Sequence, residues 1–278
     1  AIEARKNIVD ISFMPENPQI LNELAELNEV TAIVDAGIAP GLSNLMFGRA
    51  LLEFDKLHTA KCFVGGLPQN PQPPWYYKTV FSPLDVIEEY TRPARLVENG
   101  KVIIKPAMTE IEQIKFNNIG TLDAFNSDGL RTLLDLQIPN MVEKTLRFPG
   151  HIQKIIKMRN DGDFYKNRIK QTSSMLIKKW HPDENDFDQT VMRLEFSGEK
   201  GRKKITETYD LLDYFDYKNN ISSMARTTGY TCTAAANLVL SGNWCEQGVF
   251  ALETLGKVKS HSDFIIQYLR ERNIKLEK

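Results

Sequence analysis

The sequence has little of what would mark a secreted, membrane-spanning or nucleic-acid-binding protein. Its three cysteines, Cys62, Cys232 and Cys245, are an odd number without a C-x-x-C spacing, which argues against a disulfide framework. No apolar run approaches the roughly 18 residues that a membrane-spanning helix needs. Lysine and arginine together number 35 against 36 acidic residues, so no basic surface for nucleic acid or anionic lipid is predicted. We expect a cytoplasmic protein with no nucleic-acid partner and no membrane partner.

The common catalytic and cofactor motifs are also absent. The sequence contains no H-E-x-x-H, no G-x-S-x-G and no G-x-x-x-x-G-K-[ST]. Its histidines, His58, His151, His181 and His261, have no ligand partner at a suitable spacing, so no metal site is predicted. There is no G-x-G-x-x-G, the glycine fingerprint that holds the pyrophosphate of a dinucleotide.

The first residues of the sequence have the pattern expected in the middle of a folded domain. Residues 1–6 resemble the end of a helix that leads directly into a β-branched strand at residues 7–13, and no methionine precedes them. A helical spacing follows at residues 15–28, and a second buried strand at residues 30–35. Strand, helix and strand within about 30 residues predict a parallel sheet covered by helices. We expect the sequence to be N-terminally truncated within such a domain.

After a helix predicted at residues 42–54, the pattern changes to α+β. Antiparallel hairpins are indicated, with a turn near Gly198–Gly201, and a long helix is expected to end at Ser241-Gly242. The last helix is expected at residues 262–272, with Ser260 or Ser262 as its N-cap. Strands are predicted at residues 58–64, 101–106, 142–147, 190–196 and 204–214, and further helices at 83–90, 128–135, 151–158, 167–179 and 222–240.

One segment, residues 34–44, joins a buried strand to a helix through a turn rich in glycine and proline. Ligands of doubly wound sheets lie beyond the carboxyl ends of strands, and Gly37 and Gly41 would allow a close backbone approach. Asn44 would lie at the start of the helix, where free N–H groups attract anions. A tight connection with a serine cap is an equally good interpretation.

Three other segments carry candidate chemistry. Residues 65–78 form a stiff loop that presents Tyr77 and Lys78 and could line a pocket, although a solvent-exposed linker has the same composition. Arg147 ends a strand before a Pro-Gly turn and His151, which suits carboxylate binding; a surface arginine and a helix cap are the alternative. Arg226 and Thr228 begin a helix of small residues, which could present donors or simply pack closely.

Taken together, these stretches resemble the saccharopine dehydrogenase family, in the branch that includes lysine 6-dehydrogenases and carboxynorspermidine dehydrogenases. The matching motifs are VDISF, DAGIAPGLSN, GGLPQNPQPPWYYK with SPLDVIEEYTRPARLVENGK, EKTLRFPGH and ARTTGYT, which occur in family order from residue 9 to about 256.

The resemblance implies an α/β plus α+β fold. A partial Rossmann domain, without its glycine fingerprint, would comprise residues 1–50, and residues 241–278 would return to it. Residues 51–240 would form an α+β substrate and dimerisation domain like that of glyceraldehyde-3-phosphate dehydrogenases. The implied activity is hydride transfer between the C–N carbon of an amino-acid amine, saccharopine or lysine, and NAD or NADP, in a cytoplasmic homodimer.

The resemblance also implies roles for individual residues. Fungal saccharopine reductases have an aspartate where this chain has Ala39, which favours the lysine-dehydrogenase-like branch. A carboxynorspermidine dehydrogenase, or a non-catalytic substrate-domain fragment, are the alternatives. The base that manages the amine proton is expected to be Lys78, with His151 as its competitor. Substrate binding is expected from Asp35, Tyr77, Arg147, Arg226 and Thr228, and cofactor binding from Gly37, Ile38, Ala39, Pro40 and Asn44.

Overall fold

The computed structural model describes residues 1–12 and 16–278. Residues from near both ends of the chain form a small parallel sheet. The sheet has the order β1 (Ile8–Val9), β2 (Thr31–Val34) and β11 (Gly248–Ala251), and all its pairs are parallel. The β2 side chains are buried throughout, as expected for a strand covered on both faces. Strands of this sheet come from residues 1–50 and 241–278, although the proposed domain boundaries themselves stay a prediction.

The helix expected at residues 15–28 is shorter than predicted, and residue 15 itself lies outside the described residues. A 3₁₀ turn (η2, Pro18–Leu21) precedes α1 (Asn22–Leu27), because the Asn17 side chain accepts from the Gln19 N–H and Pro18 stands at the first helical position. The apolar residues of this segment do not form a buried face: Ile20 is 76% and Leu27 79% exposed.

A mixed sheet, nine-stranded within the described residues, forms the rest of the framework. Its central strand β3 (Lys56–Pro68) runs parallel to β8 (Asn140–Arg147) and antiparallel to β9 (Asp188–Lys200). Gly65 and Gly66 belong to β3, so the loop expected from residue 65 begins only after Pro68. The remaining strands are β4 (Ala94–Glu98), β5 (Lys101–Lys105), β6 (Glu112–Phe116), β7 (Gly120–Asn126), β10 (Lys203–Tyr214) and β12 (Leu276–Glu277).

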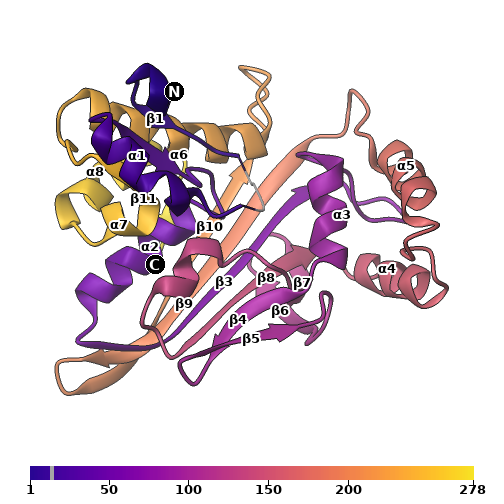
Figure 1. The fold of residues 1–278 in the computed structure, drawn as a ribbon. Coiled ribbons are helices and arrows are strands. Elements are labelled where there is room, and N and C mark those ends of the chain that lie inside the picture. The colour runs from indigo at the N-terminus through magenta and orange to yellow at the C-terminus, as the bar shows by residue number, and fades with distance from the viewer. Residues whose placement is uncertain (13–15) are drawn as a thin grey trace.

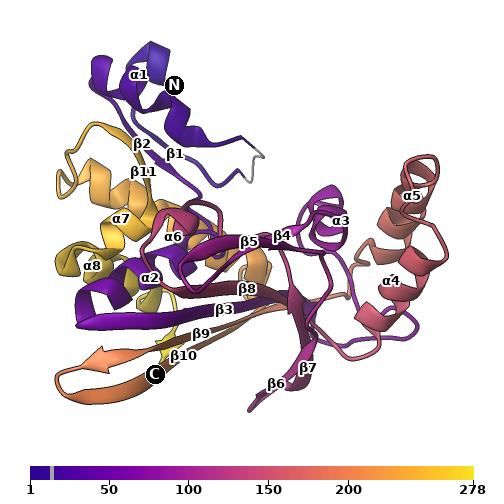
Figure 2. The same cartoon turned by 60° about the horizontal axis from the view of Figure 1, so that its bottom comes forward.

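Four helices cover one end of this sheet and join it to the parallel sheet (Figures 1 and 2). They are α2 (Leu42–Glu53), α6 (Ser223–Leu240), α7 (Leu252–Gly256) and α8 (Lys259–Arg270). Their core includes Phe47 against Phe196 of β9, with ring centroids 5.3 Å apart. Helices α2 and α7 approach closely because Gly48 has no side chain: a Cβ there would lie 2.1 Å from the Glu253 carbonyl oxygen. The first and last quarters of the chain are therefore packed as one unit.

Two predicted helices differ from the structure. The segment expected as a helix at residues 128–135 is only a 3₁₀ turn, η3 (Arg131–Asp135). Helix α8 begins at Lys259 with Val258 as its cap, so the predicted serine N-cap is wrong; the Ser262 hydroxyl bonds instead to the Lys259 carbonyl within the helix.

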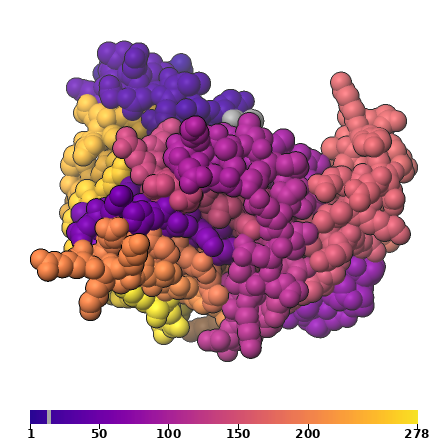
Figure 3. Space-filling view, turned by 90° about the horizontal axis from the view of Figure 1, so that it is seen from below, coloured from indigo at the N-terminus to yellow at the C-terminus, as the bar shows by residue number. Residues whose placement is uncertain are grey.

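The opposite end of the molecule has a second core. Helices α3 (Pro83–Thr91), α4 (His151–Asn160) and α5 (Ile169–Trp180) surround buried aromatic side chains, including Tyr77, Tyr90 and Trp180. The space-filling view shows the indigo N-terminal and yellow C-terminal residues together at one end and the α4–α5 region at the other (Figure 3). None of the helices in the described ranges combines the length and apolar character needed to cross a bilayer.

Candidate active site

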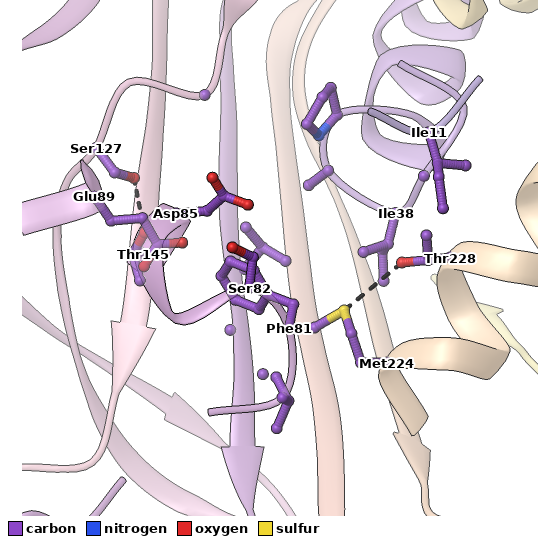
Figure 4. A pocket seen from close by; sticks show the side chains of 18 of the residues that line it. Ile11, Ile38, Phe81, Ser82, Asp85, Glu89, Ser127, Thr145, Met224 and Thr228 are labelled. Carbon is purple, nitrogen blue, oxygen red and sulfur yellow. Dashed lines mark hydrogen bonds between the residues drawn. The ribbon is translucent and has the colours of Figure 1, made fainter. Parts of the chain in front are cut away.

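A cavity of about 580 Å³ lies where the parallel sheet meets the larger mixed sheet. One wall comes from the turn after β2 and the start of α6, and includes Ile38, Met224 and Thr228. The facing wall comes from α3, the loop before η3 and strand β8, and includes Asp85, Glu89, Ser127 and Thr145. Figure 4 shows the largely apolar first wall opposite the polar second wall. The cavity thus offers two chemically different surfaces to a bound molecule.

The turn after β2 lines the cavity, while its predicted contact with the cofactor stays a prediction. Gly37, Ile38, Ala39 and Pro40 all line the cavity. Gly41 adopts φ +140°, and a Cβ there would lie 1.9 Å from the Gly37 carbonyl oxygen, so only glycine closes this turn.

The start of α2 has a different role from the one predicted. The N–H groups of Leu42 and Ser43 already donate to the carbonyls of Gly37 and Ile38, at 2.9 Å each, which leaves these donors unavailable to an anion. Asn44 does not line the cavity; its amide donates to Glu253 at 3.0 Å, and its side-chain oxygen accepts from the Gly41 N–H at 3.0 Å. Asn44 therefore holds the turn together, and the prediction that it lines a cofactor site is wrong.

Asp35 is buried beside the cavity without lining it. Its carboxylate accepts from the Arg131 guanidinium at 2.8 Å, which joins the end of β2 to η3. Burial raises the pKa of Asp35, and Arg131 opposes that rise. Asp35 therefore connects the turn after β2 to η3, and it does not make the predicted contact with a substrate in the cavity.

Alternate residues of β8 point into the cavity, because successive side chains of a strand face opposite sides. Glu143, Thr145 and Arg147 form this face. Arg147 is fully buried and well held: it donates to Glu89 at 2.6 Å, to the Tyr90 hydroxyl at 3.1 Å and to the Leu146 carbonyl at 2.9 Å. Arg147 therefore lies at the cavity, while its predicted contact with a substrate carboxylate stays a prediction.

Five carboxyl groups line the cavity, and three of them have a cationic partner. Glu88 pairs with Arg92, Glu89 with Arg147, and Asp128 with Arg95. Asp85 and Glu143 have no ion pair among the described residues. These two side chains are the cavity's unneutralised carboxyl groups.

Glu143 is a functional candidate that the sequence analysis missed. It is only 6% exposed, and its Oε2 is buried without a hydrogen-bond partner. Burial, together with the nearby carboxyls of Glu89 and Asp128, raises the pKa of Glu143 from 4.5 to about 8. The signal that could have found it is its spacing from Arg147, four positions along the same strand, which places both on one face.

The two residues predicted as bases lie elsewhere. Lys78 binds Asp186 at 2.7 Å and Asp183 at 3.1 Å; burial would lower its pKa, but these two hydrogen bonds raise it overall. His151 is fully buried, with one ring nitrogen 2.9 Å from the Tyr90 hydroxyl and the other 2.7 Å from the Trp75 carbonyl oxygen. Burial and the Arg147 charge lower the pKa of His151 to about 3. Neither side chain lines the cavity, so the geometry does not support either as the base.

The other predicted substrate ligands divide between the cavity and the interior. Thr228 lines the cavity, and its hydroxyl contacts the Met224 sulfur at 3.6 Å. Tyr77 is buried against His151 and under the Arg147 guanidinium, 4.4 Å from the ring centroid, outside the cavity. Arg226 binds Asp213 and Asp216, 3.1 Å from each, and anchors α6. Of the predicted residues Asp35, Lys78, Arg147 and Arg226, Arg147 alone lines the cavity.

The lining of the cavity is compatible with the nicotinamide end of a dinucleotide. The Gly37–Pro40 backbone beyond the carboxyl end of β2 and the apolar wall with Ile38 and Met224 would suit a flat ring. The sequence offers no G-x-G-x-x-G turn for the pyrophosphate. Within the described residues, no three His, Cys, Asp or Glu side chains gather in a way that could hold a metal ion.

Comparison with known proteins identifies the family. A model of the saccharopine dehydrogenase C-terminal domain matches residues 37–274. The alpha-aminoadipic semialdehyde synthase of Arabidopsis thaliana is 27% identical over 108 residues, which cover 37% of this chain and 10% of that protein. The mitochondrial enzyme of the same name from Mus musculus is 29% identical over 114 residues, covering 37% of this chain and 12% of that protein. The match therefore spans about a tenth of the length of these curated relatives.

The fold has a solved counterpart. The apo saccharopine dehydrogenase (L-Glu forming) from Saccharomyces cerevisiae superimposes with a TM-score of 0.80 over 99% of this chain and 80% of that chain, at 17% identity. This likeness confirms the predicted fold class, an α/β part joined to an α+β part. Since the family model spans most of the sequence, the chain belongs to the saccharopine dehydrogenase family.

Proposed function

We propose that this chain is the substrate-binding part of an oxidoreductase that transfers a hydride between the C–N carbon of an amino-acid amine, saccharopine or lysine, and NAD or NADP. The observation that carries the proposal is the pairing of two walls in one cavity. The polar wall combines Arg147 with the carboxyl groups of Asp85 and Glu143, and the apolar wall follows the end of β2.

An amino acid brings a carboxylate and an ammonium group, and the polar wall suits the ammonium group. Asp85 and Glu143 can accept hydrogen bonds from it, whereas the Arg147 guanidinium is fully buried and already donates to Glu89. A bound nicotinamide supplies the hydride chemistry. The protein residues would then orient the amine-bearing carbon toward the apolar wall and exclude water from the space between the walls.

The charge of the cavity favours lysine over saccharopine. At neutral pH lysine carries two ammonium groups and one carboxylate, whereas saccharopine carries two ammonium groups and three carboxylates. Because the arginines of the cavity already pair with Glu88 and Glu89, the two additional carboxylates of saccharopine gain little there, whereas either molecule can place an ammonium group near Asp85.

The test uses the full-length protein with lysine, saccharopine and carboxynorspermidine, each with NAD and with NADP, and follows the absorbance of the reduced nicotinamide. We expect oxidation of lysine with the highest kcat/KM. The Asp85→Asn variant should raise KM for lysine by about 10- to 100-fold, the value of a charged hydrogen bond. Glu112→Gln, which removes an exposed carboxylate of β6 that pairs with Lys144, is the matched control and should leave KM unchanged. Failure to oxidise any of the three amines would contradict the proposal.

A non-catalytic fragment is the alternative for the 278 residues taken alone. This alternative is tested by titration of this chain with NAD and NADP, compared with a version extended at its N-terminus by about 100 residues, enough for the βαβαβ half that carries the glycine fingerprint. We expect tight binding only in the extended version, because the pyrophosphate-binding turn is not in this sequence. Equal affinity in the two versions would show that these residues bind the dinucleotide by other means.

A further inference from the structure

Glu143 occupies an unusual place on the polar wall of the cavity. Its neighbours on the same face of β8 have hydrogen-bond partners: Thr145 donates to the Ser127 hydroxyl at 2.8 Å, and Arg147 donates to Glu89 at 2.6 Å. The Glu143 carboxyl group is buried to a similar degree, yet its Oε2 has no partner. A buried polar atom that lines a cavity without a partner is costly unless a bound molecule completes it.

The backbone around Glu143 is shaped to hold its carboxyl group in this position. Gly129 lies against it so closely that a Cβ at residue 129 would be 1.5 Å from Glu143 Oε1. Both Gly129 and Glu143 line the cavity. A side chain at residue 129 would occupy the place of the carboxyl group, so this glycine fixes where Glu143 reaches the cavity.

The surroundings of Glu143 are mostly acidic or neutral. Two carboxylates lie near it: Glu89 of α3 and Asp128 of the loop before η3. Arg131 of η3 brings a positive charge, and Cys62 of β3 is the partner of Glu143 on the adjacent strand. Burial is the largest influence, and with the two carboxylates it brings the pKa of Glu143 to about 8. A carboxyl group with such a pKa exchanges its proton near neutral pH, which suits acid–base work.

We propose that Glu143 accepts the proton of the substrate's reacting ammonium group; this inference rests on the proposed amine oxidation. In this step the N–H bond breaks and its electron pair stays on nitrogen, while an O–H bond forms at the Glu143 carboxylate. The ammonium becomes a neutral amine and the carboxylate a carboxylic acid, so charge and atoms balance. The lone pair left on nitrogen is what the oxidation of a C–N carbon requires.

The first test measures protons, independently of turnover. Lysine is titrated into the full-length protein at pH 7 by calorimetry in phosphate and in Tris, whose ionisation enthalpies differ. At pH 7 the Glu143 carboxyl group is mostly protonated, because its pKa is about 8. A bound ammonium group favours the ionised carboxylate, so Glu143 should release up to about 0.9 proton when lysine binds. Glu143→Gln should release none, and the control Glu112→Gln should behave like the natural protein.

The second test measures catalysis. We expect Glu143→Gln to lower kcat by about 10²- to 10⁴-fold and to remove the rise of kcat/KM toward pH 8, with partial recovery in Glu143→Asp. Circular dichroism and thermal unfolding of each variant separate this loss from misfolding.

The outcomes distinguish the two proposals. If the natural protein oxidises lysine or saccharopine, but Glu143→Gln keeps its rate and its proton release, the role of Glu143 is overturned and the proposed function stands. If the natural protein neither binds nor oxidises these amines, the proposed function and the role of Glu143 are both overturned.

Discussion

Replacing Glu143 by glutamine should stabilise the folded protein in alkaline solution and have little effect in acid. The carboxyl group is 6% exposed and lacks a partner for Oε2, so its charged form is poorly solvated in the folded state. Glutamine has nearly the same shape and never ionises. Above the ordinary pKa of a glutamate, the folded protein must either keep the proton on Glu143 or bury its charge. Both lower the free energy of unfolding relative to the glutamine variant.

The size of the effect follows from the shift in pKa from 4.5 to about 8. At about 1.36 kcal/mol per pKa unit, the full difference in the free energy of unfolding approaches about 5 kcal/mol. The folded state binds the proton more tightly than the unfolded chain. The stability that this proton contributes is fully present below pH 4.5 and is lost as the pH rises through about 8. Between pH 6 and pH 9, the advantage of Glu143→Gln should grow by about 2–3 kcal/mol.

Urea unfolding of the natural protein and the variant at pH 5, 6, 7 and 9 measures this difference directly. The control is Glu112→Gln, whose side chain is 42% exposed; its effect on the free energy of unfolding should be the same at pH 6, 7 and 9, because it removes no buried carboxyl group. A Glu143→Gln variant that is less stable at pH 9, or whose advantage does not change with pH, would refute the reasoning that Glu143 is buried without a partner.

Three further predictions concern other close contacts. Gly48→Ala places a Cβ 2.1 Å from the Glu253 carbonyl oxygen, so it should push α2 and α7 apart. We expect the free energy of unfolding, measured in urea, to fall by about 2–3 kcal/mol. An unchanged urea midpoint would contradict the close packing of the two helices. Gly129→Ala should displace the Glu143 carboxyl group and so weaken lysine binding in calorimetry. Combining it with Glu143→Ala should restore the free energy of unfolding but not the binding of lysine. If the two substitutions instead lower the free energy of unfolding additively, residues 129 and 143 are not in direct contact. The His151 ring should stay neutral in an NMR titration from pH 8 to pH 5, because its pKa is lowered to about 3, and a midpoint near pH 6.5 would show that it is exposed.

The sequence predicted those parts of the fold that depend on local pattern. The buried strand at β2, the helix α2 and the long helix α6 follow from runs and spacings of apolar residues, and they lie close to their predicted bounds. Strand β4 and the hairpin of β6 and β7 were missed because their composition is mixed, and because β4 and β7 pair with β8, which lies further along the chain.

The candidate site was predictable only where backbone shape or strand position decides it. The Gly37–Pro40 turn and Arg147 were found because a strand end followed by glycine or proline marks the edge of a sheet. Lys78 was assigned wrongly because its partner Asp186 lies more than a hundred positions along the chain. Glu143 was missed because a glutamate in a strand is usually exposed, and the neighbouring strands that bury it cannot be read from local sequence.

The position of β11 also bears on how the protein is made. Residues Gly248–Ala251 pair with Thr31–Val34, so the parallel sheet cannot form until more than two hundred intervening residues have been synthesised. At about 5–20 residues per second, the ribosome needs roughly 10–45 s to reach them. During that interval the edge of β2 on its β11 side presents unpaired backbone N–H and C=O groups, which could pair with another chain.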